Sequence, residues 1–174
     1  ASSSWFGVEN GIICQQVNCK GKMGAGLAKA IATEFPIVKE KFLQNYEKNN
    51  GHQFASFEVI PLDENNNLSI ANIYSQDNYG IPSKTGQIYT NATVLIMNIT
   101  NIALANKNKQ IYVPKNIGCG LGGGDWSQIK SMLNQSVINN NINNISILDT
   151  MTNQIEPISC FESISLPDNE YERD

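Results

Sequence analysis

The sequence has few of the residues on which metal and thiol chemistry depend. It contains one histidine, His52, and four cysteines, none of them in a CxxC pair. A zinc site needs several Cys, His or carboxylate ligands, usually with close pairs of Cys or His. We therefore expect no metal and no cofactor. Unpaired, reduced thiols are typical of a cytoplasmic protein.

Positive charge and long apolar runs are also scarce. Twelve Lys and Arg residues stand against 16 Asp and Glu, for a net charge of -4. No basic cluster could follow a nucleic-acid backbone, so polymeric nucleic acid is not an expected partner. No apolar run approaches the roughly 20 residues that a membrane-spanning helix needs, and the serine-rich start lacks a signal pattern. We therefore expect no membrane partner.

The length and the pattern of apolar residues predict a single domain. The chain has 174 residues, of which 41% are hydrophobic, enough for one core. We expect one domain over 1–174, favoured as a monomer, with its core over about 8–150. A C-terminal extension over about 151–174 carries the apolar residues Ile158, Phe161, Ile164 and Leu166, and part of it should pack as an extra strand or as a cover. Alternating strands and helices predict a three-layer α/β/α sandwich on a mixed, mostly parallel sheet.

Apolar periodicity and turn residues place the elements along the chain. We expect a hairpin turn over 63–67, surface loops over 75–87 and 139–144, and His52 in an exposed turn. The first helix should bury Leu27, Ala30 and Ile31. The predicted strands are 11–17, 57–62, 68–74, 111–114 and 145–148, and the predicted helices are 26–35, 37–49, 89–106 and 126 to about 137.

Two glycine-rich turns are the most informative feature. The first glycine loop, Asn18-Cys-Lys-Gly-Lys-Met-Gly-Ala-Gly26, and the second glycine loop, Gly118-Cys-Gly-Leu-Gly-Gly-Gly-Asp-Trp126, each follow a predicted strand and open a predicted helix. Glycine lets backbone N–H groups converge on an oxyanion, and a helix N-terminus adds donors at the same place. The pair predicts a cleft that holds a phosphate-bearing ligand from both sides.

Known nucleotide motifs fit these loops poorly. Gly118-x-Gly-x-x-Gly123 formally matches the dinucleotide fingerprint. That fingerprint normally closes the first βα turn of its unit, whereas this one lies in the last third of the chain. No GxxxxGK[ST] motif occurs, which argues against a Walker-type nucleotide hydrolase.

Two polar residues in these loops are candidates for chemistry. Asn18 either contacts ligand hydroxyls or forms an Asx turn that shapes its loop, and the sequence leaves both alternatives open. Asp125 is a good helix N-cap and the only carboxylate in either loop, so it is also the first candidate for positioning a water. Cys19 and Cys119 have no histidine nearby to activate a thiolate, which favours packing roles.

Residues 14–31 with Phe35-Pro36, and residues 113–126, resemble the two ligand loops of a macro domain. The branch they resemble contains ADP-ribose 1''-phosphate phosphatases and terminal ADP-ribose hydrolases, and the likeness extends from Gly11 to about Leu148. The resemblance implies a ligand, ADP-ribose or ADP-ribose 1''-phosphate, with its pyrophosphate between the loops. It implies that Asn18 contacts the hydroxyls of the distal ribose. Together with the carboxylate of Asp125, this makes Asn18 and Asp125 the expected catalytic residues. The implied binding residues are Ile13 beside the adenine and Cys19, Lys22, Met23, Gly24, Ala25, Gly26, Gly118, Cys119, Gly120, Leu121, Gly122, Gly123 and Gly124 around the phosphates.

The departures from the family pattern bear on activity. Gln76 stands where hydrolases acting on protein or DNA adducts carry a lysine, and Gly122 stands where one of them carries an aspartate. Gln15 replaces a histidine of related phosphatases, and Glu9 is the nearest acidic candidate for the adenine amine. We therefore expect hydrolysis of ADP-ribose 1''-phosphate without a metal. The alternatives are removal of ADP-ribose from protein or nucleic acid, and binding without turnover.

Overall fold

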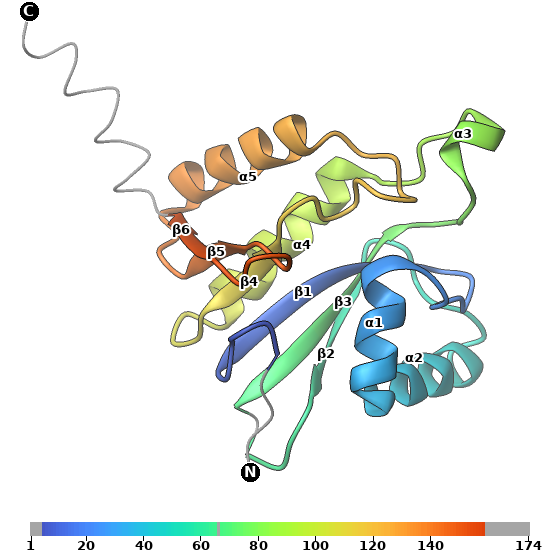
Figure 1. Ribbon diagram of the computed structural model, residues 1–174, viewed down its shortest axis with the longest axis horizontal. Coiled ribbons are helices and arrows are strands. Elements are labelled where there is room, and N and C mark those ends of the chain that lie inside the picture. The colour runs from blue at the N-terminus through green and yellow to red at the C-terminus, as the bar shows by residue number, and fades with distance from the viewer. Residues whose placement is uncertain (1–4, 66, 159–174) are drawn as a thin grey trace, which may run out of the picture.

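The computed structural model describes residues 5–65 and 67–158, which form a six-stranded mixed sheet (Figure 1). Its order is β2-β3-β1-β4-β5-β6. The central strands β3, β1, β4 and β5 are parallel, and the edge strands β2 and β6 are antiparallel to their neighbours. The predicted mixed, mostly parallel sheet is therefore confirmed. The strands are β1 Gly11–Asn18, β2 Phe57–Pro61, β3 Leu68–Gln76, β4 Ile111–Pro114, β5 Ile145–Leu148 and β6 Ile155–Ile158.

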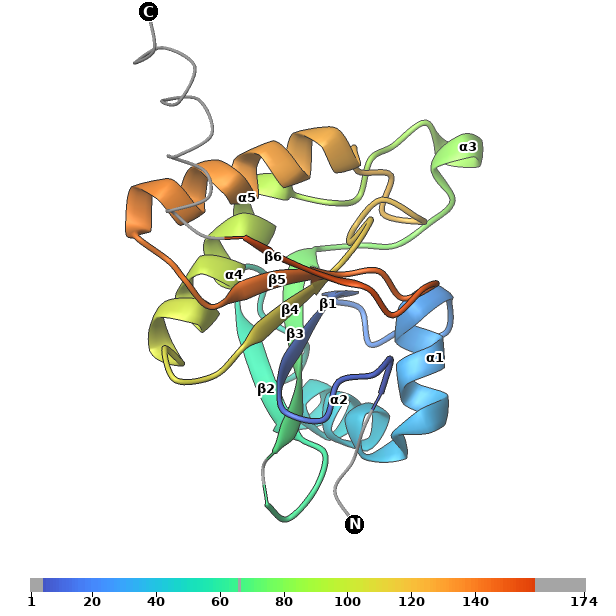
Figure 2. The same ribbon diagram turned by 60° about the vertical axis from the view of Figure 1, so that its left-hand side comes forward.

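Helices cover both faces of this sheet (Figure 2). Ile12 and Cys14 of β1 belong to a core shared with α4 and α5, whereas Ile13 and Val17 belong to a second core shared with α1 and α2. Successive side chains of a strand point to opposite faces, so β1 serves both cores. This arrangement is the predicted three-layer sandwich. The helices are α1 Gly26–Glu34, α2 Pro36–Lys48, α3 Pro82–Thr85, α4 Ala92–Ala105 and α5 Trp126–Asn140.

The helix boundaries follow from local chemistry. Pro36 stands at the start of α2, where its missing N–H costs nothing. Asn91 caps α4 by accepting a hydrogen bond from the backbone N–H of Val94 at 3.0 Å. Asp125 caps α5, as predicted. Each polar cap supplies an acceptor that the first turn of a helix otherwise lacks.

Several predicted details are wrong. The predicted loop over 75–87 begins inside β3 and contains the short helix α3. Ala30 is exposed, because α1 packs through Ala28 and Ala32 beside Leu27 and Ile31. The predicted loop over 139–144 begins inside α5.

His52 is another correction, because it does not lie in an exposed turn. Its ring packs against both Phe42 and Tyr74, with ring centroids 4.4 Å from each. Burial lowers its pKa, and the nearby Glu58 carboxylate acts in the opposite direction.

The C-terminal extension contributes β6, which pairs with β5 as the expected extra strand. The predicted packing of Phe161, Ile164 and Leu166 lies outside the described residues. Within the described ranges, no helix combines the length and apolar character needed to cross a membrane.

Candidate functional site

The sheet topology places the two glycine loops side by side. β1 and β4 are parallel neighbours, so the loops that follow them leave the same edge of the sheet. A Cβ built on Gly118 would lie 3.4 Å from Nε2 of Gln16, which confirms that the second loop reaches the end of β1. In open α/β sheets, ligands bind at this carboxyl edge. The structure therefore brings together the first and the second glycine loop, which are almost a hundred residues apart in the sequence.

Asn18 shapes the first glycine loop from within. Its Oδ1 accepts from the backbone N–H of Lys20 at 3.0 Å and of Lys22 at 3.4 Å. Its Nδ2 donates to the carbonyl oxygen of Lys22 at 2.9 Å. The Asx-turn alternative is therefore what the structure contains. A carboxamide carries two hydrogens, and no described residue accepts the second hydrogen of Nδ2, although the residue is buried.

The first loop ends in a helix N-terminus without a side-chain cap. Ala25, the residue before α1, offers no side-chain acceptor, and the N–H groups of Gly26, Leu27 and Ala28 bond to none of the described residues. A Cβ built on Gly24 meets no heavy atom of those residues within 4 Å. Unpaired donors beside open space, at the positive end of a helix dipole, suit an anion.

The second glycine loop is closed on itself. The N–H of Gly124 donates to the carbonyl oxygen of Gly118 at 2.9 Å, and that of Gly123 donates to Gly120 at 3.0 Å. Between these bonds, the N–H groups of Gly120 and Leu121 have no partner in the described part of the chain. Gly120 also faces open space. This loop presents free backbone donors from a constrained turn.

Asp125 uses one carboxylate oxygen as the cap of α5. Oδ1 accepts from the N–H of Ser127 at 2.9 Å and of Gln128 at 3.4 Å. Oδ2 forms no hydrogen bond with the described residues and belongs to an exposed side chain. The residue can therefore cap the helix and also accept a hydrogen bond from a water.

The described thiols are poor nucleophiles. Burial raises the pKa of Cys14 to about 12 and that of Cys19 to about 11. Burial, followed by the Asp125 charge, raises the pKa of Cys119. A thiol with a raised pKa holds little thiolate at neutral pH, which agrees with packing roles.

Three of the proposed binding residues have buried side chains. Ile13 is fully buried in the core shared with α1 and α2, so it offers no surface to an adenine ring. Cys19 and Met23 are buried in the same core, which leaves only their backbone for a ligand. Lys22 and Ala25 are exposed.

Gln76 lies directly across from Asn18. The two residues are partners in the register of β3 and β1, at the carboxyl ends of both strands. The Gln76 side chain accepts from Gln16 at 3.1 Å and donates to the carbonyl oxygen of Asn78 at 2.9 Å. Gln76, which stands where related hydrolases carry a lysine, thus lies at the edge of the sheet from which both glycine loops leave.

Sequence reasoning missed Gln16 and Thr90. Gln16 Nε2 donates to Thr90 Oγ1 at 2.8 Å, and Thr90 Oγ1 donates to the carbonyl oxygen of Gly118 at 2.6 Å. A Cβ on Gly122 would lie 2.2 Å from that hydroxyl, so Gly122 is required for packing. The available signal was the polar pair Gln15-Gln16 inside an otherwise apolar strand.

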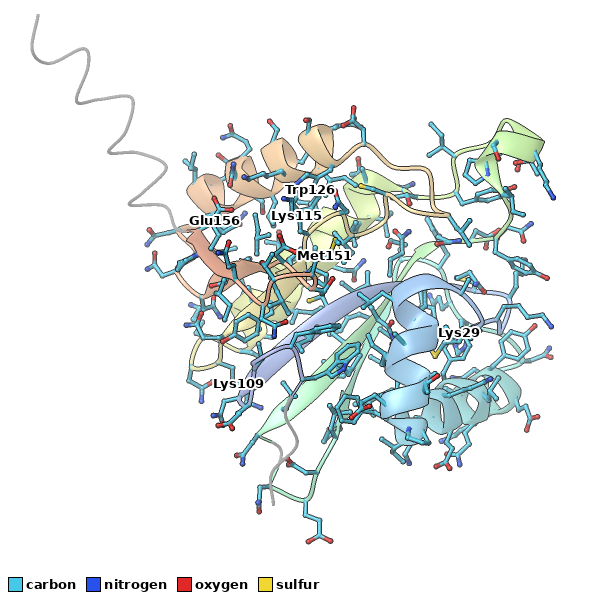
Figure 3. The ribbon with its side chains drawn as sticks, viewed as in Figure 1. Lys29, Lys109, Lys115, Trp126, Met151 and Glu156 are labelled. Atoms are coloured by element: carbon cyan, nitrogen blue, oxygen red, sulfur yellow. The ribbon has the colours of Figure 1, made fainter. Side chains whose placement is uncertain are left out.

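Two pockets lie away from the glycines of these loops. One, of about 610 Å³, lies between the end of α2 and β2 and includes His52 and Glu58. The other, of about 450 Å³, includes Lys115, Trp126 and Glu156, which Figure 3 shows between α5 and the strands β5 and β6.

Comparisons with known proteins show similarity in structure. No protein-family model matches the sequence, and no curated protein matches it. The macrodomain of Mycobacterium tuberculosis DarG superposes with a TM-score of 0.65 at 19% identity, over 84% of this chain and 93% of that chain. Thermosipho africanus DarTG, solved with ADP-ribose, gives 0.63 at 21% identity, over 83% of this chain and 39% of that chain.

A Bacteroides thetaiotaomicron protein gives a TM-score of 0.67 at 21% identity, over 79% of this chain and 88% of that chain. The sheet order, the helices on both faces and these superpositions agree. The chain has the macrodomain fold.

Proposed function

We propose that this protein binds ADP-ribose with the pyrophosphate between the two glycine loops. The observation that carries the proposal is the pair of free donor sets at neighbouring strand ends: the N–H groups at the start of α1, and those of Gly120 and Leu121. A diphosphate presents two anionic groups a few bonds apart, which suits two donor sets on adjacent strands. The Thermosipho africanus DarTG structure, which contains ADP-ribose, supports the choice of ligand.

We further propose that the protein hydrolyses ADP-ribose 1''-phosphate. A water would attack phosphorus and give up one proton to Asp125, the bond between phosphorus and the 1'' oxygen would break, and that oxygen would leave as a hydroxyl of ADP-ribose after taking up the proton from Asp125. The free Oδ2 of Asp125 would hold the water and accept its hydrogen. The loop N–H groups would stabilise the charge on the phosphoryl oxygens, which is commonly a large part of catalysis. No metal enters this scheme.

The phosphate ester is favoured over protein or nucleic-acid adducts because of Gln76. The side chain at this position is a neutral amide that is already bonded to Gln16 and Asn78. It can supply neither the charge nor the proton of a lysine. We therefore expect adducts of ADP-ribose to be poor substrates.

Binding without turnover is the second candidate. The observation in its favour is that Asn18 spends most of its hydrogen-bonding capacity on its own loop, which leaves Asp125 as the main polar group for chemistry. A reader of ADP-ribose needs the donor loops alone.

A substrate panel tests the proposal. The protein is incubated with ADP-ribose 1''-phosphate, ADP-ribosylated DNA and a glutamate-linked ADP-ribosylated protein, and released phosphate or ADP-ribose is measured. We expect phosphate release from the first and no reaction with the other two. Turnover of either adduct at a comparable rate would refute the argument from Gln76. Binding of ADP-ribose with no turnover of any substrate would establish the reader.

A further inference from the structure

A directed chain of hydrogen bonds lies beneath the second glycine loop. Ser75 Oγ donates to Gln16 Oε1 at 2.7 Å, and Gln16 Nε2 donates to Thr90 Oγ1 at 2.8 Å. The amide nitrogen can only donate, so the single hydroxyl hydrogen of Thr90 is left to point at the carbonyl oxygen of Gly118, 2.6 Å away. The direction of every bond in the chain is therefore fixed.

The backbone of the same segment holds the other side of the turn. The N–H groups of Tyr89 and Thr90 donate to the carbonyl oxygen of Gly122 at 2.8 and 3.0 Å. Residues 89–90 thus bond to Gly118 and to Gly122, on either side of the two free donors at Gly120 and Leu121. The lack of space for a side chain on Gly122 shows how closely this segment fits the loop.

We infer that Thr90 is a positioning residue that holds the second glycine loop in its binding conformation, with Gln16 setting the direction of its hydroxyl. Thr90 acts through Gly118 and Gly122, not through a contact of its own with the ligand. Donors that are already held in place lose less conformational freedom on binding. The consequence for ADP-ribose rests on the proposed function, whereas the effect on the loop does not.

The test compares substitutions that remove the Thr90 hydroxyl with substitutions that keep it. Thr90→Val removes the hydroxyl, Thr90→Ser keeps it, and Thr93→Val makes the valine substitution at an exposed position of α4. Hydrogen exchange of the Thr90, Gly123 and Gly124 amides is followed without ligand, and ADP-ribose binding is measured by calorimetry. In Thr90→Val, the loss of one hydrogen bond should raise the exchange rate of these amides about fivefold. It should also weaken ADP-ribose binding about fivefold. Thr90→Ser and Thr93→Val should behave like the native protein.

Gln16→Glu gives an independent test in which Thr90 remains. A carboxylate at this position accepts the Thr90 hydrogen, which draws it away from Gly118, and exchange should rise by about the same fivefold. Unchanged exchange rates in Gln16→Glu and in a folded Thr90→Val would overturn the inference. Exchange in Thr90→Ser as fast as in Thr90→Val would overturn it as well. Faster exchange in a protein that does not bind ADP-ribose would support the positioning role and refute the proposed ligand.

Discussion

The two glycine loops present free backbone donors by different means. The first loop is held by one of its own side chains, Asn18, and its donors belong to the start of a helix that has no side-chain cap. The second is held from outside by Thr90, and the helix that follows it is capped by Asp125. A cap consumes the donors of the first turn, so the second loop must offer its own N–H groups instead. The difference shows that similar glycine-rich sequences can build donor sites by separate routes.

The largest expected effect follows removal of the internal support of the first loop. Asn18→Ala loses the amide that holds the backbone of Lys20 and Lys22 and that, under the proposed function, would donate its second hydrogen to the ligand. We expect turnover of ADP-ribose 1''-phosphate to fall about 10²-fold, the scale of losing one oriented donor, with a smaller loss of ADP-ribose affinity. Steady-state kinetics gives the first quantity and calorimetry the second.

Asn101→Ala, at an exposed position of α4, is the matched control for Asn18→Ala. Native turnover in Asn18→Ala would show that the first loop keeps its shape without this side chain.

The second loop should be sensitive to bulk at one glycine and tolerant at another. A Cβ at Gly122 would meet the Thr90 hydroxyl at 2.2 Å, whereas one at Gly120 meets open space. Overpacking of this kind costs about 1–3 kcal/mol, so Gly122→Ala should lower the free energy of unfolding by that amount. Gly120→Ala should leave it close to the native value in denaturant unfolding. Equal stability of the two variants would contradict the packing of Thr90 against Gly122.

Two substitutions of Asp125 distinguish its role as the cap of α5 from a role in hydrolysis. Asp125→Ala should lower the free energy of unfolding by about 1 kcal/mol, because the first turn loses its acceptor. Asp125→Asn keeps the acceptor oxygen and removes the charge, so it should melt like the native protein. If Oδ2 holds the attacking water, Asp125→Asn should lose phosphate release. Full activity in that variant would limit Asp125 to its cap.

The smallest expected effect lies away from both loops, at His52. Its pKa in the folded state is lowered by burial, so below about pH 6.5 the unfolded state binds more protons than the folded state. Stability from this residue is therefore complete above that pH and is lost as the pH falls toward the folded pKa. Denaturant unfolding across this range should show a smaller loss in His52→Phe than in the native protein. An identical pH dependence would refute the burial effect.

The sequence predicted the parts of the site that are local in the chain. Glycines, a following helix and an Asp before Trp126 specify a donor loop and its cap within a few residues. The hydrogen bond from Gln16 to Thr90 joins residues 74 positions apart, so no local pattern signals it. Asn144 shows the same limit. It lies in an asparagine-rich run that predicts only a loop, yet its buried Nδ2 donates to the carbonyl oxygens of Ala103, Asn106 and Lys109.

Under the proposed function both loops hold the same pyrophosphate, so binding of ADP-ribose in calorimetry should depend on each loop. We expect micromolar affinity, on the order of -8 kcal/mol, for the native protein. Gly24→Glu and Gly120→Glu each place a carboxylate in open space where a phosphate would bind, so each should remain folded and lose binding. Ala30→Glu adds the same charge at an exposed position of α1 and should bind like the native protein. The absence of heat with the native protein, or undiminished binding in both glycine variants, would show that the two loops do not hold a pyrophosphate between them.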